Sequence, residues 1–118
     1  MNYLFICYPK CTTCQKAKKW LDEHTISYEE RHIKDHNPTF DELRQWHKQS
    51  NLSLKKIFNT SGLLYKSLQL KERLDAMSEA EQLALLATDG MLVKRPILIA
   101  GSKVLVGFKE DAWRELIK

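Results

Sequence analysis

A short apolar run followed almost at once by a helical pattern constrains the fold of this chain more than any other feature. Residues Tyr3 to Tyr8 are mostly apolar or aromatic and end at Pro9, which is typical of a strand buried on both faces. From Cys14 onward, apolar side chains recur at helical spacing between charged ones: Ala17, Trp20, Leu21 and His24. The chain is therefore predicted to begin with a strand, a tight loop and a helix.

Two further patterns predict the remaining strands. The more polar segment Ile26–Ile33 completes a βαβ unit, which implies parallel pairing through a right-handed crossover. Near the other end, Ile97–Ala100 and Val104–Val106 flank a Gly-Ser turn and predict an antiparallel hairpin. A last helix is expected to begin at Glu110 and Asp111 and to face inward with Trp113, Leu116 and Ile117.

The middle of the chain is predicted to be helical. Capping boxes at Thr39/Glu42 and Ser78/Glu81 each begin a helix, and Leu52–Phe58 is expected to form a shorter one. The inward residues predicted for the first helix are Phe40, Leu43 and either Trp46 or His47. Those predicted for the last are Ala80, Leu83, Ala84 and Ala87, with Asp89 and Gly90 ending it. The resulting order is β, α, β, helical block, β, β, α.

This order predicts an α/β chain with a thioredoxin-like fold and a helical insertion between its βαβ and ββα halves. A length of 118 residues fits one domain over residues 1–118, with the insertion at about 37–90. The longest apolar runs fall far short of the ~20 residues of a membrane helix, and the opening segment lacks a basic leader. We therefore expect a cytoplasmic protein with no membrane association.

The net charge and its distribution do not indicate a particular class of binding partner. The net charge is +4, but acidic and basic residues are interleaved along most of the chain, and we expect no direct binding of nucleic acid. Gly-rich nucleotide loops, a Walker pattern and a His/Glu metalloprotease helix are absent from the sequence.

The pair Cys11 and Cys14 is the most informative motif. It lies between a strand and a helix start, where unpaired backbone N–H groups and the helix dipole favour a thiolate. We expect Cys11 to be the exposed nucleophile and Cys14 to be the more buried, resolving cysteine. Four lysines lie close in sequence and can lower a thiol pKa and attract anions, or simply form a solvated helix face: Lys10, Lys16, Lys18 and Lys19.

Two other interpretations of the cysteine pair stay open. With His32 and His36 it has the ligand count of a structural zinc site, but the spacing from Cys14 to His32 exceeds that of a zinc finger and Pro38 opposes a helix there. The pair can also be two inert core cysteines. We expect no bound metal or cofactor, and histidines that serve as surface or packing residues.

A second candidate site is the segment Lys94-Arg95-Pro96. An Arg before a proline at a strand entrance can accompany a cis peptide bond and can deliver a guanidinium to an oxyanion or carboxylate beside a thiolate.

Four blocks in order resemble the ArsC-like family, which includes glutaredoxin-linked arsenate reductases and the Spx/MgsR redox regulators. They are Pro9–Cys14, Phe58–Gly62, Asp89–Pro96 and Val106–Glu110. The resemblance implies a thioredoxin-like fold, Cys11 as redox nucleophile, and Arg95 facing it before a cis Pro96. The residues then expected to bind substrate or an anion are Lys10, Thr12, Thr13, Arg95 and Pro96.

The chain also departs from this family. Arsenate reductases of this type bring three arginines to the oxyanion, and here Asn59 and Gly107 occupy two of those positions. Cys7 replaces a His before the nucleophile and Cys14 replaces a Ser after it, which favours an internal dithiol. The regulators usually contact RNA polymerase through a Gly where this chain has Ser53.

The sequence therefore predicts first a thiol–disulfide oxidoreductase, with arsenate activity itself in doubt. Its partners would be a disulfide-bearing protein and a thiol reductant such as glutathione with glutaredoxin, or thioredoxin. The alternatives are an Spx-like redox regulator that binds the RNA polymerase alpha subunit, and a redox-inert adaptor.

Overall fold

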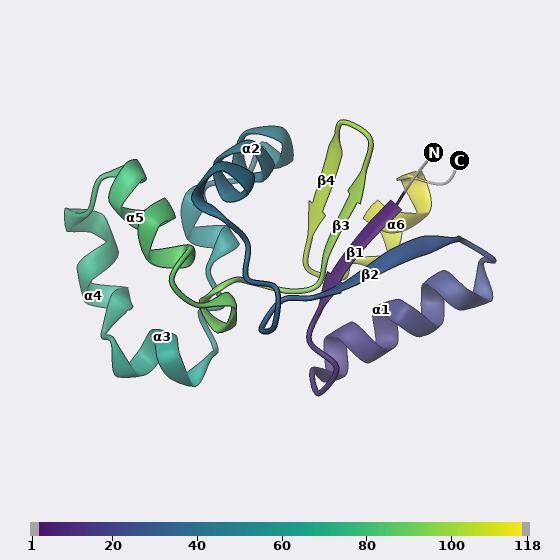
Figure 1. Cartoon of the computed structure of the whole chain (residues 1–118), viewed down its shortest axis with the longest axis horizontal. Coiled ribbons are helices and arrows are strands. Elements are labelled where there is room, and N and C mark those ends of the chain that lie inside the picture. The colour runs from purple at the N-terminus through teal and green to yellow at the C-terminus, as the bar shows by residue number, and fades with distance from the viewer. Residues whose placement is uncertain (1–2, 117–118) are drawn as a thin grey trace. The chain divides into compact units, whose positions relative to one another are not determined.

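The computed structural model describes residues 3–116, and its centre is a four-stranded sheet of order β2-β1-β3-β4 (Figure 1). The strands are β1 Tyr3–Cys7, β2 Tyr28–His32, β3 Ile97–Ala100 and β4 Lys103–Val106. β1 pairs in parallel with β2 and antiparallel with β3, and β3 pairs antiparallel with β4. This pairing confirms the predicted α/β class, the parallel βαβ unit and the C-terminal hairpin.

The chain forms two compact units. The first comprises the residues up to His32 and those from Arg95 onward, and it holds the sheet with helices α1 (Thr12–Glu23) and α6 (Glu110–Leu116). The second is the helical segment Ile33–Lys94, which begins directly after β2 and contains the predicted insertion.

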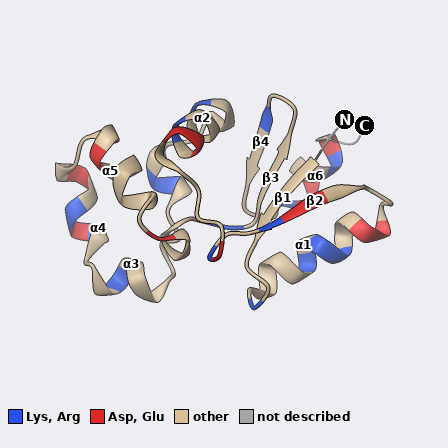
Figure 2. Ribbon diagram, viewed as in Figure 1, with Lys and Arg blue, Asp and Glu red and all other residues tan. Residues whose placement is uncertain are grey.

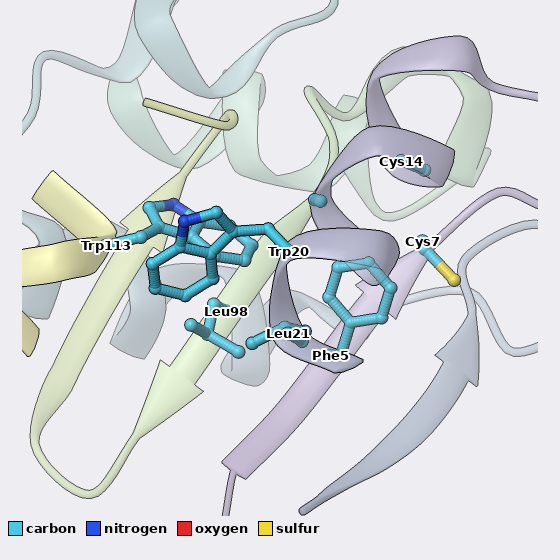
Figure 3. Close-up of a cluster of buried hydrophobic side chains, with 8 residues drawn as sticks. Phe5, Cys7, Cys14, Trp20, Leu21, Leu98 and Trp113 are labelled. Atoms are coloured by element: carbon cyan, nitrogen blue, oxygen red, sulfur yellow. The ribbon is translucent and has the colours of Figure 1, made fainter. Parts of the chain in front are cut away.

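The core of the first unit lies between the sheet and its helices (Figure 3). α1 buries one face, as its spacing predicts, through Cys14, Ala17, Trp20 and Leu21. Trp113 of α6 is fully buried, and its ring makes edge contacts with Phe5, Trp20 and Phe108 at centroid distances of 6.3, 5.9 and 4.9 Å. Leu116 is half-buried, and Ile117 lies outside the described residues.

The second unit confirms both capping boxes. They begin α2 (Phe40–Ser50) and α5 (Glu79–Leu86), and in each the cap hydroxyl accepts from the N3 backbone N–H while the N3 glutamate accepts from the cap residue. Two short helices, α3 (Leu63–Ser67) and α4 (Leu70–Arg73), precede α5 in the block predicted to be helical.

Three details of that block differ from prediction. The expected helix Leu52–Phe58 is a 3₁₀ turn over Leu54–Ile57. The buried face of α5 consists of Leu83 and Leu86, whereas Ala80 and Ala84 are exposed, because the larger leucine side chains gain more free energy from burial than alanines do. α5 also ends at Leu86, before the predicted stop at Asp89 and Gly90.

Within residues 3–116, none of the helices has the length and apolar character needed to cross a membrane.

Candidate functional site

The loop from β1 to α1 holds Cys11 at the N-cap of the helix. The Cys11 backbone N–H donates to the Tyr8 carbonyl at 2.9 Å, which closes a tight turn, and the Cys11 carbonyl accepts from the Gln15 N–H at 3.0 Å. The Gln15 side chain also donates to the Pro9 carbonyl at 2.9 Å. The first turn of α1 has no acidic residue, so negative charge on the Cys11 sulfur meets no opposing carboxylate there.

Cys11 is the half-exposed thiol of the pair, and its pKa is lowered. Burial acts to raise that pKa, but several groups that favour the thiolate outweigh it: the Cys14 backbone N–H and thiol, the Arg95 guanidinium and the Thr13 backbone N–H. The Cys11 sulfur is therefore the one more readily ionised and more readily reached from solvent.

Cys14 has the opposite environment. It is 2% exposed, and burial raises the pKa of its thiol to about 12, despite a hydrogen bond of 3.4 Å from the Tyr8 backbone N–H to its sulfur. Donation of its S–H to Cys11 and the charge of Cys11 raise the pKa further. The pair thus consists of one thiol that ionises readily and one that keeps its proton.

Arg95 comes to the same loop from the other end of the first unit. The Arg95–Pro96 peptide bond is cis, as the family resemblance implied. The guanidinium lies 5.2 Å from the centroid of the Tyr8 ring and lowers the pKa of Cys11. Tyr8, which sequence reasoning did not select, therefore contacts both Arg95 and Cys14. Its position directly after the strand is the signal that could have indicated this role.

The lysines and threonines of the predicted anion site have different positions. Lys10, Thr12 and Thr13 are exposed around Cys11. Lys18 instead pairs with Glu30 of β2, with 2.8 Å between Nζ and Oε1 (Figure 2 shows the charges along α1 and β2). Lys18 is thus engaged with β2.

Gly107 takes one of the positions where the family resemblance called for an arginine. Its φ is +79°, its N–H donates to the Pro96 carbonyl at 2.8 Å, and its carbonyl accepts from Trp113 Nε1 at 3.1 Å. A side chain at this position would be strained, because only glycine adopts positive φ at little cost. An arginine introduced here would have to adopt this backbone conformation or shift it.

The structure also brings together side chains that the sequence did not associate. His32 lies beside Glu30 and Cys7. The pKa of the Glu30 carboxyl lies below its usual value, chiefly because Lys18 and then His32 hydrogen-bond to it. Cys7 is 3% exposed, and burial, with the nearby charge of Glu30, raises the pKa of its thiol to about 11.

Comparison of the sequence with known proteins identifies a family and several relatives. A sequence model of the ArsC family matches residues 7–116. The uncharacterized protein YusI of Bacillus subtilis is 56% identical over 115 residues, 98% of each chain. The regulatory protein MgsR of B. subtilis is 33% identical over 97% of this chain and 89% of its own. The global transcriptional regulator Spx of Staphylococcus saprophyticus is 33% identical over 92% of this chain and 82% of its own.

Solved structures agree with these sequence matches. A protein related to the ArsC family from Bacteroides fragilis is 55% identical with a TM-score of 0.95, over 98% of each chain. A possible arsenate reductase from Streptococcus mutans is 42% identical with a TM-score of 0.90, again over 98% of each chain.

Proposed function

Because the chain belongs to the ArsC family, whose sequence model matches residues 7–116, we propose that it is a thiol–disulfide oxidoreductase that uses Cys11 and Cys14. The observation that carries this proposal is the asymmetry of the pair: a half-exposed Cys11 with a lowered pKa beside a buried Cys14 with a raised one. Such an asymmetry suits a nucleophile and a resolving thiol.

The reaction consists of two thiol exchanges. The Cys11 thiolate attacks one sulfur of a substrate disulfide, forms a mixed disulfide and releases the other sulfur as a thiolate. Cys14 then transfers its proton to the released substrate thiolate and attacks the Cys11 sulfur, which releases the second substrate sulfur and leaves a Cys11–Cys14 disulfide. Two electrons pass to the substrate, and an external reductant, namely glutathione with glutaredoxin or thioredoxin, restores the dithiol.

The protein environment assists each step. The N–H groups at the start of α1 and the Arg95 guanidinium stabilise the attacking thiolate. We expect Lys10, Thr12, Thr13 and the buried Pro96 to contribute to binding of the substrate. Reduced thiols of this kind fit the reducing cytoplasm, where we place the protein.

Trapping of the mixed disulfide tests the proposal. A Cys14→Ser variant should accumulate a lasting adduct at Cys11 with a small aromatic disulfide, because no resolving thiol remains. The lowered pKa of Cys11 keeps the thiolate present below the usual cysteine value of 9.0, so adduct formation should persist as pH falls below 9 and decline only near the lower pKa. Mass spectrometry of the intact protein against pH measures both expectations.

The matched controls separate the roles of the cysteines. In the Cys14→Ser background, a further Cys11→Ser change should abolish the adduct, whereas a further Cys7→Ser change should leave it unchanged. An adduct on Cys14 in preference to Cys11, or a rate that follows an ordinary thiol pKa, would show that the nucleophile is wrongly assigned.

A second candidate function is redox-dependent regulation through the RNA polymerase alpha subunit. The observation that favours it is the 33% identity with MgsR and Spx over most of this chain. Ser53 lies exposed at the start of the 3₁₀ turn of the second unit, where those regulators usually have glycine.

We expect Ser53 to weaken binding to the RNA polymerase alpha subunit. Purified alpha subunit should therefore not be retained by this protein when it is immobilised, whether oxidised or reduced. Stoichiometric retention that depends on the redox state would instead establish the regulator.

A further inference from the structure

Three side chains with metal-ligating atoms meet on one face of the sheet. The parallel register of β1 and β2 sets Cys7 opposite His32, and Glu30 lies two residues before His32, on the same face. The Cys7 sulfur, a ring nitrogen of His32 and a carboxylate oxygen of Glu30 all lie within 4.8 Å of one another. Figure 3 shows the Cys7 sulfur on the side of β1 that faces β2.

We propose that Cys7, Glu30 and His32 form a binding site for one Zn²⁺ ion, with the fourth coordination position left to water. Thiolate, imidazole and carboxylate are the donors that zinc takes in proteins, and three protein ligands with one open position is an established arrangement for it. The mixture of soft sulfur with nitrogen and oxygen disfavours Mg²⁺ and Ca²⁺, which prefer oxygen alone.

The three donor atoms would have to move only slightly to coordinate zinc. Tetrahedral zinc with bonds of roughly 2.0 to 2.3 Å holds its donor atoms about 3.3 to 3.6 Å apart. In the structure His32 Nε2 and Glu30 Oε2 are 2.8 Å apart and share a hydrogen bond. The ion would take the place of the shared proton, which moves to Nδ1 of His32 or to solvent. The Cys7 thiol proton is released to solvent when the Zn–S bond forms.

The surroundings orient one ligand and leave a path of entry. Glu30 Oε1 accepts from Lys18 at 2.8 Å, which fixes the carboxylate while Oε2 remains directed at His32. The positive charge of Lys18 opposes a cation, so the site should be weaker than a closed structural zinc centre. The side chains of His32 and Glu30 are 38% and 29% exposed, and β2 is an edge strand, so the ion can enter from solvent although Cys7 is buried.

This site is distinct from the zinc interpretation that the sequence offered. That interpretation joined His32 and His36 to Cys11 and Cys14, whereas the strand register joins His32 to Cys7 and Glu30. The proposed redox chemistry uses Cys11 and Cys14, so the metal proposal and the redox proposal can fail independently.

Titration of the reduced full-length protein with Co²⁺, followed by displacement with Zn²⁺, tests the site. We expect one equivalent of Co²⁺ to give a thiolate-to-cobalt charge-transfer band that one equivalent of Zn²⁺ removes. Cys7→Ser should abolish the band. Glu30→Gln and His32→Ala, which alter partly exposed side chains, should each weaken binding at least about 10-fold, since even outer partners of metal ligands change affinity by about 10- to 100-fold.

Two matched controls identify the ligands. The Cys11→Ser/Cys14→Ser double variant, which keeps Cys7 as its one thiol, and His36→Ala should both bind cobalt as the parent does. The proposal is overturned if the parent gives no band, if the double variant loses it, or if neither Glu30→Gln nor His32→Ala weakens binding. Far-UV circular dichroism of each variant establishes that a lost band does not reflect a lost fold.

Discussion

Arsenate should bind this protein about two to four orders of magnitude more weakly than it binds a pocket with three arginines. The arsenate reductases that the sequence resembles bring three arginines to the oxyanion, and of these Arg95 is the one present here. A hydrogen bond to a charged group contributes roughly 1.5 to 3 kcal/mol, so two missing arginines cost about 3 to 6 kcal/mol. Lys10 and the loop amides offset part of that loss.

Arsenate reduction coupled to glutathione and glutaredoxin measures this expectation, beside reduction of a small disulfide by the same preparation. We expect the first activity to be weak or undetectable and the second to be retained. Arg95→Ala should weaken the residual arsenate binding, whereas Arg114→Ala, a change at an exposed position of α6, should not. Turnover with a Michaelis constant between about 1 μM and 1 mM would contradict the prediction and assign arsenate as a substrate.

Replacement of Trp113 by alanine should destabilise the protein by about 3 to 5 kcal/mol, as expected for a large aromatic side chain removed from a core. Trp113 is fully buried against Phe5, Trp20 and Phe108, and its Nε1 donates to the Gly107 carbonyl at 3.1 Å. The loss is a large fraction of the roughly 5 to 15 kcal/mol that stabilises a typical domain.

Urea unfolding followed by far-UV circular dichroism measures the change in the free energy of unfolding. Trp113→Phe is the matched control: it keeps an aromatic ring in the core but leaves the Gly107 carbonyl without this donor, so a smaller loss of about 1 to 3 kcal/mol is expected. Equal costs for the two variants would mean that the hydrogen bond, rather than the packing, holds α6 on the sheet.

Local patterns account for the elements that were predicted correctly. Both capping boxes are present because a hydroxyl and a glutamate three residues apart satisfy backbone groups within a single turn. The burial of α1 follows from its 3.6-residue period. The α5 face was predicted in part: Leu83 is buried as expected, whereas Ala80 and Ala84 are exposed. Alanines and leucines there share a helical spacing, and only the packing of the second unit decides which of them is buried.

The candidate site also has one part that local sequence predicts and one part that it does not. Cys11 and Cys14 were recognisable because their chemistry depends on neighbours close in sequence, namely the turn before α1 and its first N–H groups. The proximity of Arg95, in contrast, depends on the return of the chain to the sheet more than eighty residues later. The Arg-Pro motif allowed this proximity, and the resemblance to a family implied it.

The sequence by itself determined the order of the elements, the position of the cysteine pair at a helix start and the family, because periodicity, caps and motifs act over a few residues. Only the tertiary structure decided that Lys18 turns to β2, that Gly107 adopts a positive φ, and that Cys7 stands opposite His32. The first two depend on contacts with other elements, namely Lys18 with Glu30 and the Gly107 N–H with the Pro96 carbonyl. The third depends on register, because a strand shifted by one residue exchanges its two faces and nothing local in either strand fixes the pairing.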